Sequence, residues 1–95
     1  MSAQASILVV DDEFSMRELL EIVLENAGYI VSTANGVDAA IETLEGTPFD
    51  VVITDLFMGN DRDAGMKLIQ WLQENSPHIP VIMMTAHGSV ELAVE

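Results

Sequence analysis

The stretch ILVVDDE, residues 7–13, decides the fold of this chain. Its four consecutive apolar residues are typical of a parallel strand that is covered on both faces, and two aspartates follow where the strand ends. A third aspartate, Asp55, follows a second apolar run, residues 51–54. Because the carboxyl ends of parallel strands meet at one crevice of an open α/β sheet, we expect Asp11, Asp12 and Asp55 to converge there.

Three converging carboxylates predict a cation, because like charges at close range repel one another unless a positive charge lies between them. Mg²⁺ prefers oxygen ligands and fits such a cluster. Thr85 ends a third apolar run, residues 81–84, and adds a hydroxyl to the same edge. Taken singly, these residues also have structural explanations, since acids cap helices and support turns. Together they favour a site that handles phosphoryl groups.

Predicted strands and helices alternate along the whole chain. Short apolar runs predict strands, whereas apolar residues spaced by three and four predict helices between them. The strands are expected at residues 7–10, 29–34, 51–54 and 81–85, and the helices at 16–27, 37–44, 66–72 and from Gly88 and Ser89 onward. Gly28 is expected to end the first helix in a left-handed conformation. The fold class predicted is α/β, a flavodoxin-like parallel sheet of order 2-1-3-4 with helices on both faces.

Size and charge narrow the possible functions. The chain has 95 residues, enough for one domain, and a formal net charge of −13. Its basic residues are Arg17, Arg62 and Lys67, too few for a nucleic-acid interface, which needs cations to replace counterions. Cysteine is absent, and we find neither a signal-peptide pattern nor an apolar stretch of membrane-spanning length. We therefore expect a cytoplasmic protein with no direct nucleic-acid or membrane contact.

Three segments in this order, ILVVDDE, VVITDL and PVIMMTAHGS, resemble the receiver domain of bacterial two-component response regulators. The resemblance runs from about Ser6 to the last residue. Within that family, the segment MTAHGSVELAVE is most similar to regulators of the nitrogen-regulatory, NtrC-like activator type. The resemblance implies a signalling switch that takes its phosphoryl group from a sensor histidine kinase.

The resemblance also implies a role for each site residue. Asp55 would be the phosphoacceptor, and Thr85 would contact the phosphoryl group. Asp11, Asp12, Asp55 and the main-chain carbonyl of Phe57 would bind Mg²⁺. After Asp55 the chain departs from the family pattern, because its polar loop, residues 59–65, is longer and carries further acids.

The family continues with a fifth strand, which bears a lysine, and a fifth helix. Neither is expected within these 95 residues, so residues 1–95 are expected to form a receiver domain that is incomplete at its C-terminus. The strand at 81–84 would then be an open apolar edge, which is a template for pairing with another chain. We therefore expect self-association through the fourth strand or fourth helix, with a swapped dimer as one form.

Three functions are compatible with this sequence. The first is a phosphorylation-dependent switch that catalyses only its own phosphoryl transfer and hydrolysis and is not a turnover enzyme. The second is a phosphorylation-silent fragment that acts only by self-association. The third is a phosphohydrolase of the haloacid-dehalogenase type, although Asp11-Asp12-Glu13 matches its D-x-D motif only loosely.

Overall fold

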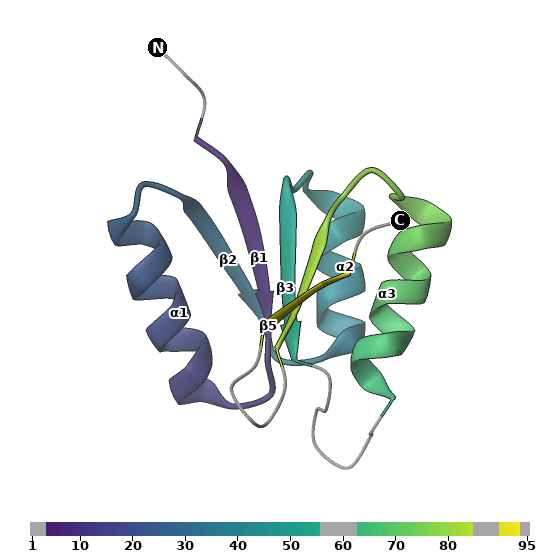
Figure 1. The fold of residues 1–95 in the computed structure, drawn as a ribbon, viewed down its shortest axis with the longest axis horizontal. Coiled ribbons are helices and arrows are strands. Elements are labelled where there is room, and N and C mark those ends of the chain that lie inside the picture. The colour runs from purple at the N-terminus through teal and green to yellow at the C-terminus, as the bar shows by residue number, and fades with distance from the viewer. Residues whose placement is uncertain (1–3, 56–62, 85–89, 94–95) are drawn as a thin grey trace.

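The structure is a computed structural model of the chain and describes residues 4–55, 63–84 and 90–93. The elements are β1 (Ser6–Val10), α1 (Phe14–Asn26), β2 (Ile30–Ala34), α2 (Val37–Gly46), β3 (Val51–Asp55), α3 (Ala64–Asn75), β4 (Val81–Met84) and β5 (Val90–Ala93). The strands form one sheet of order β2-β1-β3-β4-β5. Helix α1 covers one face of this sheet, and α2 and α3 cover the other (Figure 1).

The first four strands confirm the predicted parallel sheet of order 2-1-3-4. β1 pairs in parallel with both β2 and β3, and β3 pairs in parallel with β4. In this register Val10 lies beside Ala34 on one side and Thr54 on the other, and Asp55 lies beside Met84. The carboxyl ends of all four strands therefore meet at one edge of the sheet, the lower edge in Figure 1.

Alternate residues of the central strands point into two separate cores. Leu8 and Val10 face α2 and α3, where they pack with Leu68 and Leu72 in the larger core. Ile7 and Val9 face α1, where they form a smaller core with Ile53. Side chains of a strand point alternately to the two faces of a sheet, so a strand buried on both faces needs an uninterrupted apolar run. This explains why residues 7–10 lack a polar interruption.

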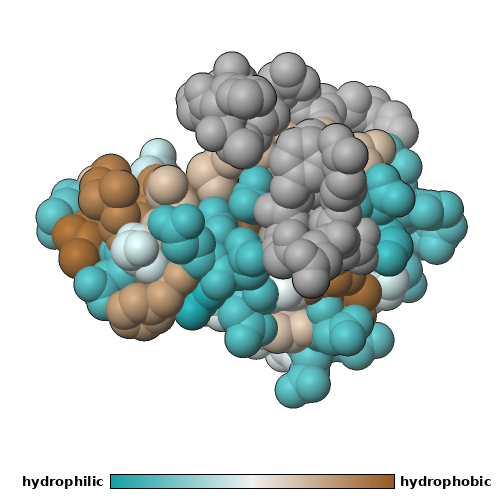
Figure 2. All heavy atoms as spheres, turned by 90° about the horizontal axis from the view of Figure 1, so that it is seen from below, coloured by the Kyte–Doolittle hydropathy of each residue, from teal (hydrophilic) through white to brown (hydrophobic). Residues whose placement is uncertain are grey.

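Helix α1 forms where its periodicity predicts it, but much of its apolar surface is left uncovered. Leu20 and Leu24 pack against the smaller core, whereas Leu19 and Val23 are 54% and 52% exposed. No residue of α1 is buried by the described part of the chain. Figure 2 shows the resulting hydrophobic side chains gathered on the side of the molecule where α1 lies. The periodicity predicted the helix correctly and overstated how much of it is buried.

The spacing of apolar residues in α3 predicts one buried side that includes Met66, and the structure differs from this prediction at Met66 and Leu68. Ile69 and Leu72 are buried as expected, and Trp71 lies half-buried against the larger core. Met66 is 49% exposed, and Leu68 is fully buried instead. Leu68, Ile69 and Leu72 are spaced at i, i+1 and i+4, so all three lie on the side of the helix that faces the sheet.

The predicted fourth helix is wrong. Residues 90–93 form β5, which pairs antiparallel with β4 so that Met84 lies beside Val90 and Val81 beside Ala93. Gly88 and Ser89, where this helix is predicted to begin, lie outside the described residues. The expected open edge is also wrong, because β4 is paired on both sides, with β3 and with β5. Strand pairing satisfies the backbone N–H and C=O groups of β4, and this tertiary effect outweighs a local helical preference.

Gly28 ends α1 as predicted, with a φ of 101°. The N–H of Tyr29 donates to the carbonyl of Leu24 at 3.1 Å, and the N–H of Gly28 donates to that of Glu25 at 3.0 Å. These two bonds are the Schellman pattern, in which a left-handed residue lets the chain satisfy the last carbonyls of a helix.

We expect Gly28→Ala to lower the free energy of unfolding by about 1–2 kcal/mol, the cost of a left-handed conformation for a residue with a Cβ. No atom lies within 4 Å of the position that the new Cβ would take, so the backbone alone causes the loss. Urea unfolding measures it. Gly46→Ala is the control, because Gly46 also has open space around it but no positive φ. An unchanged stability of Gly28→Ala would contradict this account.

None of the described helices is both long enough and apolar enough to cross a bilayer.

Candidate metal and phosphoryl site

The three predicted aspartates converge at the lower edge of the sheet. Asp11 directly follows β1, and Asp55 is the last residue of the neighbouring strand β3. One carboxylate oxygen from each of Asp11, Asp12 and Asp55 lies within 4.8 Å of the others. Asp11 is buried, Asp55 is half-buried and Asp12 is exposed. The group therefore opens from the protein interior towards solvent.

Asp11 is fixed in place by bonds to both its side chain and its main chain. Its carboxylate accepts a hydrogen bond from the N–H of Glu13 at 2.9 Å, and its own N–H donates to the carbonyl of Ala34 at 3.1 Å. Burial raises the pKa of the Asp11 carboxyl above its ordinary value, the bond from Glu13 acts in the opposite direction, and the negative charges of Asp55 and Asp12 raise it further. Two hydrogen bonds thus fix the conformation of Asp11 although its neighbours carry like charges.

This arrangement fits a hard divalent cation. The donor set is entirely carboxylate oxygen, as Mg²⁺ prefers, and it includes one open, solvent-facing side. Burial is the main cause of the raised pKa of Asp11, and the negative charges of Asp55, Asp12 and Glu13 add to it, so a cation bound here would favour the ionised carboxylate. Asp11, Asp12 and Asp55 would hold the ion.

Capping of the first helical turn is not what the Asp11 carboxylate does. The N-cap position of α1 is occupied by Glu13, and its side chain makes no capping bond. The Asp11 carboxylate bonds the N–H of this N-cap residue and not an N–H within the first helical turn. Glu13 itself is exposed, as expected for a surface acid.

Two predicted site residues, Thr85 and Phe57, lie outside the described residues, as does most of the polar loop after Asp55. Of that loop, residues 63–65 are described: Asp63 is the exposed N-cap residue of α3, and Ala64 and Gly65 are buried residues of the helix itself. On the described side of the site, Thr54 is fully buried and its hydroxyl donates to the carbonyl of Asp55 at 3.1 Å.

Comparison with known proteins places this chain in a family. Residues 7–95 match the family described as the response regulator receiver domain. The chain is a receiver domain of the response regulator family. Over 95 residues it is 40% identical to the response regulator protein PilR of Pseudomonas aeruginosa. This match covers all of the present chain but only 21% of PilR. The finer, NtrC-like resemblance is confirmed as well by the set of relatives that the chain matches.

Solved structures agree with the fold of this receiver domain. The response regulator TrrA of Thermotoga maritima, in complex with Mg²⁺-BeF, is 31% identical and superposes with a TM-score of 0.80 over 87% of this chain and 70% of TrrA. The beryllofluoride-activated receiver domain dimer of NtrC4 is 37% identical, with a TM-score of 0.78 over 88% of this chain and 68% of that one. These similarities do not favour the dehalogenase-type alternative.

Sequence reasoning missed one residue beside the acids of this receiver. The Nη1 atom of Arg17 donates to the main-chain carbonyl of Asp11 at 2.8 Å. Arg17 lies on α1, six positions after Asp11, and neither strand periodicity nor helix periodicity predicts a contact across that distance. The one feature of the sequence that singles out Arg17 is that no other basic residue precedes position 62.

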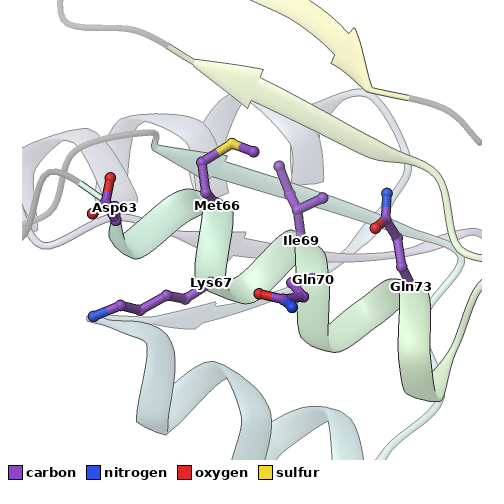
Figure 3. Close-up of a pocket in the computed structure, with 6 residues that line it drawn as sticks. All are labelled: Asp63, Met66, Lys67, Ile69, Gln70 and Gln73. Carbon is purple, nitrogen blue, oxygen red and sulfur yellow. The ribbon is translucent and has the colours of Figure 1, made fainter.

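A separate pocket of about 510 Å³ lies along α3, away from the acid cluster. Its lining residues are Asp63, Met66, Lys67, Ile69, Gln70 and Gln73. Figure 3 shows Met66, Ile69 and Gln73 pointing to one side of the helix, while Lys67 and Gln70 point to the other. None of the three clustered aspartates lines this pocket, so it contributes no group to the candidate metal site.

Proposed function

We propose that this receiver domain accepts a phosphoryl group on Asp55 with Mg²⁺ bound by Asp11, Asp12 and Asp55. The observation that carries the proposal is the meeting of three carboxylate oxygens within 4.8 Å at the ends of adjacent strands. The Asp55 carboxylate is half-buried, so a phosphorus atom can approach it from solvent. Thr85 and the carbonyl of Phe57 complete the proposed site, Thr85 as a phosphoryl contact and Phe57 as a metal ligand.

The proposed reaction is nucleophilic phosphoryl transfer. A carboxylate oxygen of Asp55 attacks the phosphorus of a phosphohistidine on the kinase, the P–N bond breaks, and the imidazole leaves with the electron pair and takes up a proton. The product on this chain is an acyl phosphate. Bound Mg²⁺ supplies positive charge that offsets the negative charge on the phosphoryl oxygens. The protein's own part is to hold Asp55 at the rim, with Thr54 anchoring its carbonyl.

A sensor histidine kinase is the proposed phosphodonor, and the cytoplasm is the proposed compartment. Receiver domains are signalling modules, and we propose that this one acts as a switch and not as a turnover enzyme. The complex of TrrA with Mg²⁺-BeF supports Mg²⁺ as the ion, because that receiver shares this fold at 31% identity.

We propose in addition that the phosphorylated chain self-associates. The NtrC4 receiver, 37% identical to this chain, is described as a dimer when activated by beryllofluoride. The edge of β4 is not the interface proposed, because β5 already pairs with it. Sedimentation velocity with and without beryllofluoride tests the proposal. A monomer under both conditions would refute it.

Intact-mass measurement after incubation with a small phosphodonor tests the proposed function. In the presence of Mg²⁺ we expect the mass to increase by one phosphoryl group, and with the metal removed by a chelator we expect no increase. Absence of uptake by folded protein that binds Mg²⁺ would instead favour the silent-fragment alternative. Steady turnover of a generic phosphate ester would favour a phosphohydrolase.

A further inference from the structure

Three hydrogen bonds from different parts of the chain hold Asp11. The end of β2 accepts its N–H through Ala34, the N–H of Glu13 donates to its carboxylate, and Arg17 on α1 donates to its carbonyl. The first two bonds follow from the path of the backbone. The third comes from a long side chain that reaches back from the helix. It is the bond that a single substitution can remove.

The position of Arg17 is unfavourable for the helix that carries it. Arg17 lies in the first turn of α1, where the N-terminal end of the helix dipole repels a positive charge. The guanidinium is held over the ring of Phe14, with 5.6 Å between Cζ and the ring centroid. Phe14 is 66% exposed, so its ring contributes little to the core and packs against the guanidinium instead. The Arg17 guanidinium thus contacts both the Phe14 ring and the Asp11 carbonyl.

We propose that Arg17 is a positioning residue of the metal site, which fixes the turn of residues 11–13 through the Asp11 carbonyl and thereby aims the Asp11 and Asp12 carboxylates. Asp11 is buried, so its carbonyl would lack this partner if Arg17 were removed, and the turn would shift to expose it to water. Groups that orient metal ligands without touching the ion are known to contribute to affinity. This inference rests on the proposed Mg²⁺ site.

The test compares Arg17→Met, Arg17→Lys and Phe14→Leu with the parent. Arg17→Met keeps the apolar stem and the helical preference but removes every donor. We expect it to weaken Mg²⁺ binding, measured by calorimetry, about tenfold. Arg17→Lys keeps a charged donor group but loses the planar guanidinium over Phe14, so it should bring the affinity back only in part, to within about threefold of the parent. Phe14→Leu, which removes the ring but leaves Arg17, should give an intermediate loss.

A second measurement needs no metal. The N–H of Glu13 donates to Asp11, so its hydrogen exchange, followed by NMR, reports directly on the turn. We expect faster exchange in Arg17→Met than in the parent, and near-parent exchange in Arg17→Lys. Lys67→Met removes the same charge from α3 and controls for net charge.

The outcomes separate this inference from the proposed function. Parent-like Mg²⁺ affinity in Arg17→Met would overturn the inference. Weaker Mg²⁺ binding in Arg17→Met with unchanged Glu13 exchange would also overturn it, because Arg17 would then act by charge alone. If Arg17→Met failed to fold, an unchanged affinity and exchange in Phe14→Leu would overturn it. A parent protein that binds no Mg²⁺ would refute the proposed function, and the exchange measurement would still test the role of Arg17.

Discussion

Asp55→Asn abolishes phosphoryl uptake and leaves the domain folded. Asparagine keeps the size of the side chain but replaces the nucleophilic carboxylate oxygen with an amide, which does not form an acyl phosphate. Asp55 is half-buried at the end of β3 and is not part of either hydrophobic core. We therefore expect the free energy of unfolding to change by no more than about 1 kcal/mol. Intact mass after incubation with Mg²⁺ and a phosphodonor measures the first effect, and urea unfolding measures the second.

The matched control for this substitution is Asp38→Asn. Asp38 is an exposed acid in the first turn of α2, so the change in charge and size is the same but lies outside the acid cluster. It should take up one phosphoryl group, as the parent does. Undiminished uptake by Asp55→Asn would show that another residue is the acceptor.

Asp11→Asn is expected to change stability in opposite directions with and without Mg²⁺. In the metal-free protein Asp11 is a buried carboxylate among the negative charges of Asp12, Asp55 and Glu13. A pair of like charges about 4 Å apart costs roughly 1–4 kcal/mol in surroundings between water and a protein surface. Asparagine removes this repulsion and can still accept the bond from Glu13. We expect a gain of about 1 kcal/mol in the free energy of unfolding in a chelator.

Saturating Mg²⁺ reverses the order of stability. The parent gains about 2.7 kcal/mol when the ion is present at 100 times its Kd. Asp11→Asn loses a ligand, so its affinity should fall by at least about 100-fold and little of that gain should remain. Urea unfolding with and without Mg²⁺ should therefore show the two proteins exchanging rank. Glu25→Gln, which removes an exposed charge elsewhere on α1, should keep the parent's response to Mg²⁺.

Without metal, the difference in free energy of unfolding between Asp11→Asn and the parent depends on pH. Its direction follows from the raised pKa of Asp11. A carboxyl whose pKa is raised on folding binds its proton more tightly in the native state, so stability falls as the pH rises through that pKa. The advantage of Asp11→Asn is thus largest above the raised pKa and closes as the pH falls towards the ordinary value of 3.8. A destabilised Asp11→Asn at neutral pH in a chelator would contradict this account.

Local patterns were sufficient for most of the sheet and for the carboxylates of the site. Residues 7–10 and 51–54 are continuous apolar runs because both faces of the central strands are covered, and this need is visible in sequence. Asp11 and Asp55 follow these runs directly, so placing the strands side by side also placed the acids together. Gly28 was predictable from a local feature of a different kind, because its left-handed backbone excludes most other residues.

Tertiary structure decided the features that depend on a partner far along the chain. Residues 90–93 have a helical preference, yet they form β5 because the edge of β4 offers backbone groups that must be paired. The apolar stripe of α1 predicts a helix but cannot specify how much sheet is available to cover it. Arg17 meets Asp11 only because the turn at 11–13 folds the helix back over the strand end. By itself the sequence determined the periodicity of each element and the residues at the strand ends, because both are local. The pairing of strand edges, the burial of helix surfaces and the contacts of long side chains depend on which elements become neighbours.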